Sequence, residues 1–561
     1  MQNIFKILLL QLIILFLIGC GGGESGNSSG NTGEGGSSGQ SGNENSEPSF
    51  IPNCSGDYCG SSGNTYTGSG VGVWHYKNNG NKNVALNVSL SNVTGKNITV
   101  VFTNEGSRKV SLPYIYVNSA LKNEMSVKNT TYIDTFNYIP DSIREFNSRD
   151  FIPQELESYQ SINYQILAKT WILEQEREWY ITNANDKLEN RMATLKRQII
   201  LANGRVINMW IETSEYGNEK ITDELIDNIS QKLKTVVSNA TNLIGEPWGE
   251  HGQKGLILGN QPLDIVFVDF NNKGSLWTLG YFYGLNNFLN GVYGDKQGNK
   301  YTIANSNEAL AIFVDTKALY TNAVSNNILL GISTIAHELT HAIQFYQRNV
   351  LMPDGFDTFL NEMAAIMMED IIAQEIDPMF NDVEKRYKKW HNNSLYGQNL
   401  ADWEKNSNSD GNYNVAASFG AYLLRQYGTD FYKELFQTKS DSSISESNTN
   451  AKSINILDEA IKTFNGEGLG HALQRWGASI AMLPADKSPK GFGYPSKNDN
   501  NGFYFEEFDG SVYKQYRSLP QSSPSILEGY AHFPFLRKAM GYTYTEKFTV
   551  PSNVSVSIIV Q

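Results

Sequence analysis

The clearest alternation of apolar and polar residues lies between about Gly70 and Tyr116. There the segment NVALNVSLSNVTGKNITVVFTNEG places apolar residues at every second position, with Gly and Asn between the runs. Because side chains alternate between the two faces of a strand, this period predicts strands joined by turns. We therefore expect a small β-sandwich-like module over residues 61–121. The chain ends with a similar alternation in VPSNVSVSIIV, which predicts a C-terminal β-rich appendage over 486–561.

The middle of the chain changes from strand patterns to helical spacing. In RQIILANGRVINMWIET, two apolar runs flank Asn203-Gly204, which is the signal of a β-hairpin. Helical spacing follows in ITDELIDNISQKLKTVVSNATNLIG, whereas PLDIVFVDF and EALAIFVDT are short apolar runs of strand length. A long helix is predicted over 326–347, and helical patterns continue to about Leu483. These elements predict an α+β domain over 165–485, preceded by a polar linker or pro-like segment over 122–164.

The first residues, MQNIFKILLLQLIILFLIGC, have the pattern of an export signal. One charged residue, Lys6, precedes an apolar run that is short for a membrane span. The closing LIGC resembles the lipobox of bacterial lipoproteins, which predicts a signal peptide over 1–19 and lipidation of Cys20. The alternative is an ordinary signal peptide that is cut elsewhere. Residues 20–60 begin with a Gly-, Ser- and Asn-rich stretch and predict a flexible tether.

These N-terminal features together predict where the protein is located. An acylated cysteine followed by a flexible tether holds a folded body at a membrane without spanning it. We therefore expect an exported protein at the bacterial cell surface or outer membrane, with the lipid membrane as a partner through acylated Cys20.

Two cysteines remain after Cys20, in the segment CSGDYC. An even pair in an exported protein predicts a disulfide between Cys54 and Cys59, with two free thiols as the alternative. A metal site on this pair is disfavoured, because no further thiol or nearby histidine completes it. The formal net charge of −13, without a dense basic cluster, argues against nucleic acid as a partner.

Residues 334–348 read TIAHELTHAIQFYQR and contain two of the seven histidines of the chain. On a helix, His337 and His341 lie one turn apart, so both imidazoles can reach the same ion. Glu338 lies about 100° around the helix, close enough to act on a water at that ion. His-Glu-Leu-Thr-His is the HExxH pattern, in which the histidines bind zinc and the glutamate is the catalytic base.

Such a site needs a third protein ligand, and Glu362 in FLNEMAAIMMED is the best candidate. The Asn361-Glu362 pair, on a second apolar helix, is the arrangement that glutamate-type zinc peptidases use. No third histidine follows at the short spacing of the metzincins, which disfavours that class. Glu369 lies on the same helical face as Glu362 and could instead bind the metal or orient a histidine. The other five histidines are expected in the core, although His471 could approach the site as a transition-state donor.

The segments NGRVINMWIET, PLDIVFVDF, STIAHELTHAIQF and FLNEMAAIMMED, in this order, resemble the hyicolysin family of bacterial zinc peptidases. The resemblance covers roughly residues 165–485, and the family belongs to the gluzincin group. It implies a zincin-like metallopeptidase core, which consists of a small mixed sheet and a helical lobe. It also implies that Zn²⁺ is held by His337, His341 and Glu362.

One position departs from the pattern of the wider gluzincin group. Thermolysin-type gluzincins carry an aspartate four residues after the glutamate ligand, where it steadies a zinc-bound histidine. This chain has Ile366 at that position. Glu369, Asp370 or another group must then supply the missing contact, or the metal is held less firmly.

These residues predict a zinc endopeptidase that acts on protein or peptide substrates, with Glu338 taking the proton of the attacking water. Tyr413 and Tyr422 follow the ligand helix and are candidates for the oxyanion donor, with a role in packing as the alternative. A function of a different class is a surface-binding lipoprotein with a degenerate peptidase core, and the intact HExxH argues against it. A third hypothesis is a zinc hydrolase of a non-protein substrate, because the motif specifies activation of water and not the bond that is cut.

Overall fold

The computed structural model describes residues 50–117, 139–147, 158–160, 170–273, 277–294, 300–321, 327–403, 409–445, 447–482, 487–508 and 517–561. The predicted signal peptide, Cys20, most of the tether and most of the 122–164 segment lie outside the described residues. In the part of the chain that is described, no helix is long and apolar enough to cross a membrane.

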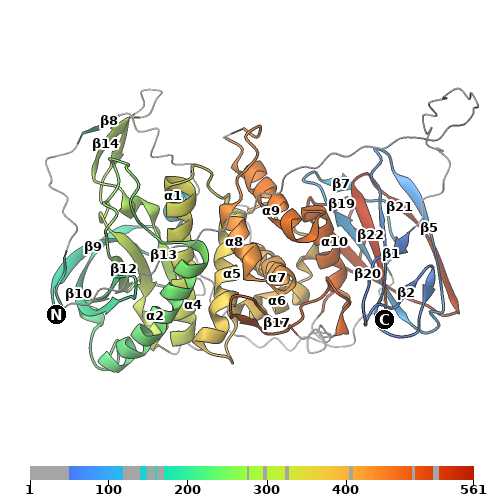
Figure 1. Cartoon of the computed structure of the whole chain (residues 1–561), viewed down its shortest axis with the longest axis horizontal. Helices are drawn as coiled ribbons and strands as arrows, with labels where there is room; N and C mark the ends of the chain where they lie inside the picture. Colours follow the sequence, from blue (N-terminus) through green and yellow to red (C-terminus); the bar gives the residue numbers. More distant parts are fainter. Residues whose placement is uncertain are drawn as a thin grey trace, which may run out of the picture. The chain divides into compact units, whose positions relative to one another are not determined.

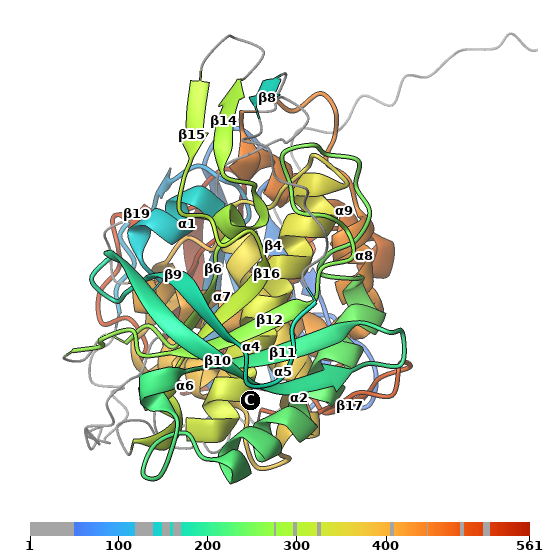
Figure 2. The ribbon, with the colours of Figure 1, turned by 90° about the vertical axis from the view of Figure 1, so that its left-hand side faces the viewer.

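A six-stranded mixed sheet forms one layer of the central α+β region (Figure 2). The strand order is β13-β16-β12-β11-β10-β9, and the bounds are Gly280–Phe282, Leu310–Asp315, Leu263–Val268, Val206–Glu212, Leu188–Ile200 and Glu176–Thr182. β11, β12 and β16 are parallel, whereas β13 lies at the edge and pairs antiparallel with β16. The predicted Asn203-Gly204 hairpin is confirmed between β10 and β11, where Gly204 has a φ of 85°. β12 and β16 are buried along their whole length, which explains their continuous apolar runs.

Helices pack against this sheet and continue beyond it (Figure 1). α2 (Asp223–Ile244) begins after Thr222, whose hydroxyl accepts a hydrogen bond from Leu225 N at 3.3 Å. α4 (Asn327–Gln344) packs against β13, β16, α2 and α5, and it continues as the π-helix Phe345–Val350. The other described α-helices are α1 Asp141–Asn147, α3 Thr316–Tyr320, α5 Thr358–Ile376, α6 Asp382–Asn392, α7 Ser409–Tyr427, α8 Thr429–Gln437, α9 Thr449–Asn465 and α10 Leu469–Ser479.

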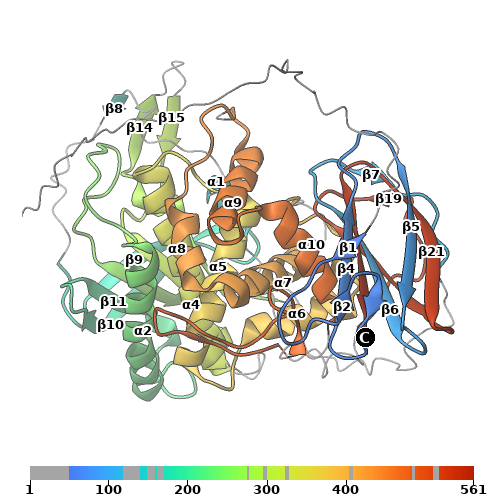
Figure 3. The ribbon, with the colours of Figure 1, turned by 45° about the vertical axis from the view of Figure 1, so that its right-hand side comes forward.

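A β-sandwich is built from strands near both ends of the described chain (Figure 3). One sheet has the order β1-β4-β22-β6-β20, with bounds Ile51–Pro52, Gly72–Lys77, Val554–Val560, Asn97–Asn104 and His532–Lys538. The other has the order β2-β3-β5-β21, with bounds Ser61–Ser62, Thr65–Tyr66, Val84–Ser91 and Thr543–Val550. Blue N-terminal strands therefore lie beside red C-terminal ones, as β6 does beside β20 and β22, and β5 beside β21.

This pairing differs from the two β regions expected from the sequence. The module predicted over 61–121 and the appendage predicted over 486–561 share their sheets and one apolar core. Alternation along a strand shows which face is buried but does not show which strand pairs with it. The sandwich packs on α10, where Gln474 Nε2 donates to Ser557 Oγ at 2.7 Å. Near its N-terminal strands, Cys54 and Cys59 form a disulfide with an S–S distance of 2.02 Å.

Three small sheets complete the described strands. They are β15-β14-β8 (Lys300–Ile303, Gly291–Gly294 and Ser158–Gln160), β17-β18 (Lys497–Asn498 and Tyr504–Phe505) and β19-β7 (Ile526–Leu527 and Val110–Ser111). β14 and β15 are seen together with β8 at the top of Figure 2.

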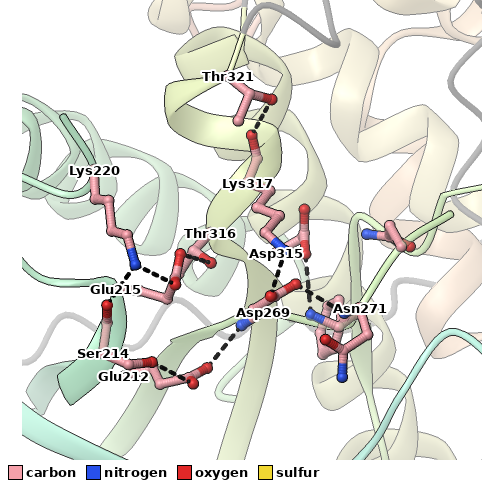
Figure 4. Close-up of polar contacts among 12 residues, drawn as sticks. Glu212, Ser214, Glu215, Lys220, Asp269, Asn271, Asp315, Thr316, Lys317 and Thr321 are labelled. Atoms are coloured by element: carbon pink, nitrogen blue, oxygen red, sulfur yellow. Dashed lines mark hydrogen bonds and ion pairs between the residues drawn. The ribbon is translucent and has the colours of Figure 1, made fainter.

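A polar network lies at the carboxyl ends of β11, β12 and β16 (Figure 4). Asp269 Oδ2 is 2.5 Å from Lys317 Nζ, and Glu215 Oε2 accepts from Thr316 Oγ1 at 3.3 Å. Asp315 is the N-cap of α3, and its Oδ2 accepts from Ala318 N at 2.8 Å. The network therefore joins the ends of the parallel strands to the short helix that precedes α4. We define Glu212, Glu215, Asp269 and Asp315 as the strand-end carboxylates.

Candidate metal centre

The HExxH motif lies in the buried part of α4. Leu330, Ile332, Ile335, Leu339, Ala342 and Ile343, the apolar residues around it, are all buried. His337 and His341 project from the same face of the helix, and their ring centroids are 4.7 Å apart. Their side chains are 6% and 7% exposed, so both imidazoles are held almost entirely out of solvent.

Glu362 of α5 faces both histidines. Its Oε2 lies 3.1 Å from His337 Nε2 and 3.6 Å from His341 Nε2. One potential ligand atom from each of the three residues lies within 4.8 Å of the others. Burial raises the pKa of the Glu362 carboxyl, but the charges of His341 and His337 and the hydrogen bond with His337 outweigh it and lower the pKa overall. The structure thus brings together the three residues that the sequence predicts as metal ligands.

The donor atoms of this group fit a zinc ion. His341 Nδ1 is hydrogen-bonded to Gln344 Oε1 at 2.9 Å, whereas His341 Nε2 is buried and has no hydrogen-bond partner. An unpaired buried nitrogen costs free energy unless another group satisfies it. A cation between this nitrogen, His337 Nε2 and the Glu362 carboxylate would do so. Two imidazoles and one carboxylate are the ligand set of one class of catalytic zinc sites.

Glu338 is fully buried and lies against the edge strand of the sheet. Its Oε2 accepts a hydrogen bond from Phe282 N of β13 at 2.8 Å. Burial raises the pKa of the Glu338 carboxyl, and the charges of His337 and His341 partly oppose this rise. The close approach of β13 to α4 depends on Gly280, where an added Cβ would lie 2.8 Å from Thr334 Cγ2. β13 thus fixes the orientation of the carboxylate next to the two histidines.

Glu369 supplies the acidic contact to His337 that an aspartate at the position of Ile366 would otherwise make. Its Oε1 lies 2.7 Å from His337 Nδ1, and its Oε2 accepts from Ser333 Oγ at 3.2 Å. Ile366 is buried in the apolar core, and Asp370 pairs with an arginine of α7 at 2.6 Å. Because Glu369 contacts Nδ1, it lies on the opposite side of the imidazole from Glu362. Of the groups proposed from the sequence, Glu369 is the one that contacts the histidine.

A small solvent-open hollow lies beside the histidines. Glu338, His341 and Glu362 line one part of it, and Ile139, Arg144 and Asn147 line another. Asn147, the last residue of α1, donates to Phe282 O at 2.7 Å and accepts from Gly284 N at 2.9 Å.

Sequence reasoning missed these α1 residues. The ring of Phe146 packs on Tyr283 with centroids 5.5 Å apart, which adds to the docking of α1 at this edge. Residues 139–147 fall in the 122–164 segment, which is polar and shows no motif. Their position depends on contacts with residues more than a hundred positions away, so no local pattern could have revealed it.

Of the three candidate transition-state donors, Tyr413, Tyr422 and His471, it is Tyr413 that lines a cavity together with a proposed metal ligand. Tyr413 of α7 borders a small cavity that it shares with His337 and Glu369. Burial raises the pKa of the Tyr413 phenol well above 10, and the charge of Glu362 adds to this rise. Tyr422 instead donates to Gly491 O at 2.9 Å in the helical core. His471 contacts Glu467 at 3.3 Å, and its charge interacts with His75 of the sandwich, so it is not brought to the site.

A protein-family model described as Peptidase M30 matches residues 186–561, which is more than half of the chain. A second model, described as a domain of unknown function (DUF8571), matches residues 52–117. No curated protein matches the chain.

Two solved structures illustrate the structural similarities. An aminopeptidase N family protein from Idiomarina loihiensis is 10% identical, with a TM-score of 0.30, and the match covers 68% of this chain and 75% of that chain. An M1 zinc metallopeptidase from Deinococcus radiodurans is 11% identical, with a TM-score of 0.28, and the match covers 56% of this chain and 63% of that chain. Similarity at this level establishes neither the fold nor the activity of the chain.

Proposed function

The chain belongs to the Peptidase M30 family, the hyicolysin family of metallopeptidases, and from this premise we propose that it is a zinc endopeptidase. In this proposal His337, His341 and Glu362 hold the zinc ion, and Glu338 is the general base. The substrates are proteins or peptides. The observation that carries the proposal is the convergence of His337 Nε2, the unpartnered His341 Nε2 and the Glu362 carboxylate within 4.8 Å.

Zinc, when bound by two histidines and a glutamate, polarises a scissile carbonyl and lowers the pKa of a bound water towards about 7. The protein contributes the transfer of protons. Glu338 is oriented by Phe282 N, and its carboxylate takes the proton of the attacking water and then passes it to the leaving amine. Burial raises the pKa of Glu338, which suits a group that must both accept and return a proton near neutral pH.

Tyr413 is the proposed donor to the oxygen that becomes negative as the carbonyl is attacked. A tyrosine phenol is protonated at neutral pH, and burial raises the pKa of Tyr413 further, so the hydroxyl can donate a hydrogen bond. The guanidinium of Arg386 lies 5.5 Å from the centroid of the Tyr413 ring, and Trp403 packs on the ring with centroids 4.9 Å apart. These neighbours hold the ring beside the cavity that contains His337.

The test of the proposed function compares Glu338→Gln with wild-type protein. The substitution keeps the size of the side chain but removes the base, so hydrolysis of a casein substrate should fall by at least about 100-fold. Zinc content should stay at about one ion per chain, because Glu338 is not a ligand. Glu375→Gln, on an exposed position of α5, is the matched control and should keep full activity. Full activity of Glu338→Gln would show that the proposed mechanism is wrong.

We also propose that acylation of Cys20 anchors the protein in a bacterial envelope membrane. The support comes from the sequence: LIGC ends an export signal, and a Gly-, Ser- and Asn-rich tether follows. Replacing Cys20 with Ala should move the protein from the membrane fraction to the soluble fraction, measured by fractionation and immunoblotting. An unchanged membrane fraction would contradict the anchor and leave the proposed peptidase activity untouched.

A further inference from the structure

Each histidine of the metal centre has its Nδ1 bonded to a side chain that is not a proposed ligand. His337 Nδ1 lies 2.7 Å from Glu369 Oε1, and His341 Nδ1 lies 2.9 Å from Gln344 Oε1. An ionised carboxylate can accept hydrogen bonds but cannot donate them. His337 must therefore donate from Nδ1 to Glu369. His337 Nε2 lies 3.1 Å from Glu362 Oε2, where a proton on Nε2 or a metal ion can satisfy both atoms. With the other proton held on Nδ1, the lone pair of Nε2 is the one that a metal ion would take.

The orientation of the Gln344 amide fixes the second histidine in the same way. Gln344 Nε2 donates to the backbone oxygen of Asn361 at 2.9 Å. Only the nitrogen of an amide can make that bond, so the atom facing His341 must be the oxygen. His341 therefore also donates from Nδ1, and its Nε2 carries the lone pair. Since Asn361 precedes Glu362, the same amide ties His341 to the first turn of α5.

We propose that Glu369 and Gln344 are positioning residues that select the Nδ1-protonated tautomer of His337 and His341 and hold both Nε2 atoms towards Glu362. The proposal rests on the proposed zinc site. It assigns a role to two residues that do not touch the metal or the substrate. It also identifies Glu369 as the residue that takes the role of the aspartate found in thermolysin-type gluzincins at the position of Ile366.

Glu369 is itself held in place, which is what such a role requires. It follows Glu362 by two helical turns, so both project from the same face of α5. Its second oxygen accepts from Ser333 Oγ at 3.2 Å, one turn before His337 on α4. The side chain is 5% exposed, so water does not compete effectively for these bonds.

The two positioning residues should differ in how much each contributes to zinc affinity. Glu369 offers a charged acceptor, and hydrogen bonds to charged groups are about twice as strong as neutral ones. Removal of a side chain that orients a zinc-bound histidine typically lowers metal affinity by about 10- to 100-fold. We expect Glu369→Ala near the upper end of this range and Gln344→Ala near the lower end. Glu369→Gln keeps an acceptor without the charge and should fall between wild type and Glu369→Ala.

The experiment measures the zinc dissociation constant of the full chain by competition with a chromophoric chelator, so it does not depend on turnover. The melting temperature of each metal-free variant is measured beside it. Gln347→Ala is the matched control, because Gln347 also donates one amide bond to a backbone oxygen, that of Glu246 at 2.9 Å. Gln347→Ala should bind zinc as wild type does. The kcat and KM of the zinc-loaded variants should show a larger change in kcat than in KM.

The outcomes separate this inference from the proposed function. Weaker zinc binding by Glu369→Ala and Gln344→Ala, at an unchanged melting temperature of the metal-free protein, supports it. Zinc affinities equal to those of wild type and Gln347→Ala would overturn it while leaving the zinc peptidase intact. Failure of wild type itself to bind zinc would overturn the proposed function. If Glu369→Ala does not fold, Glu369→Gln and Ser333→Ala decide in its place, and wild-type affinity in both would overturn the role of Glu369.

Discussion

Two polar clusters in the α+β region, the strand-end carboxylates and the metal centre, differ in how their polar atoms are satisfied. Every oxygen of the strand-end carboxylates has a partner. Figure 4 shows several of these contacts. For example, Glu215 Oε1 is 2.9 Å from Lys220 Nζ, and its Oε2 accepts from Tyr320 OH at 2.6 Å. In the metal centre, by contrast, His341 Nε2 is buried without a hydrogen-bond partner and faces Glu362.

This difference shows how a structural network can be told from a binding site. Lysines, hydroxyls and backbone N–H groups satisfy the strand-end carboxylates, so the addition of a cation would break existing bonds. The metal centre directs its Nε2 atoms and a carboxylate to one point, while other side chains engage both Nδ1 atoms. Convergent lone pairs, rather than acidity alone, distinguish the site that needs an ion.

The largest effect is expected when a ligand is removed from the metal centre. His341→Ala takes away one of the two Nε2 donors, so zinc should fall from about one ion per chain to a trace, with loss of peptidase activity. Asp269→Asn alters a strand-end carboxylate and should keep its zinc. Metal analysis of both purified variants checks this. Loss of zinc in Asp269→Asn and retention in His341→Ala would mean that the strand-end carboxylates, and not the metal centre, bind the ion.

A smaller loss is expected at Tyr413, which lines a small cavity with His337 and Glu369 and is not a proposed ligand. Tyr413→Phe removes only the hydroxyl, so kcat should fall by about 100-fold with a smaller change in KM and unchanged zinc content. Tyr422→Phe is the control, since that hydroxyl donates to Gly491 O in the core. Steady-state kinetics on a peptide substrate separate the two. Equal kcat values for both variants would exclude Tyr413 as the oxyanion donor.

Breaking the strand-end network should lower the stability of the fold without changing peptidase activity or zinc binding. Glu215→Ala removes the carboxylate that accepts from Thr316 and Tyr320 and pairs with Lys220, and Glu215 is 5% exposed. The free energy of unfolding should fall by about 1–3 kcal/mol. Thermal denaturation should show a lower melting temperature, while zinc content and kcat stay at wild-type values. A variant of normal stability that has lost zinc would mean that this network forms part of the site.

The last prediction is a pH dependence of stability at Asp315. Burial raises the pKa of its carboxyl to about 7, although the N–H groups of Phe270 and Ala318 oppose this. The unfolded chain has a pKa of about 3.9 at this group, so between the two values the folded state binds more protons. The contribution of Asp315 to stability therefore falls as pH rises from about 4 to about 7, and it is constant above.

Asp315→Asn does not titrate and isolates this contribution. The melting temperature of wild type relative to the variant should decrease as pH rises through this window and level off above about pH 7.5. A difference that stays constant from about pH 4.5 to 8 would contradict a raised pKa at Asp315.

The parts of the fold that local sequence determines were predictable. The Asn203-Gly204 hairpin follows from the backbone freedom of glycine, and the HExxH helix follows from residue spacing and apolar flanks. The third ligand could be proposed because Glu362 lies on a second apolar helix. Each of these inferences uses residues within one or two neighbouring elements.

The parts that depend on distant contacts were not predictable. The pairing of β5 with β21 joins strands more than four hundred residues apart, and neither strand carries a pattern that names the other. Glu369 could be named only as one of several groups that might contact a histidine, because the choice depends on how α5 rotates against α4. The position of Asn147 at the end of β13 has no signal in the sequence at all.

The most direct test of the metal centre is the X-ray absorption spectrum of the purified protein at the zinc edge. We expect nitrogen and oxygen ligands at about 2.0–2.2 Å, with outer-shell scattering from two imidazoles and no sulfur at about 2.3 Å. The imidazole signal should drop to one in any zinc that His341→Ala retains. A spectrum with sulfur ligands, or with two imidazoles still present in that variant, would contradict zinc at His337, His341 and Glu362.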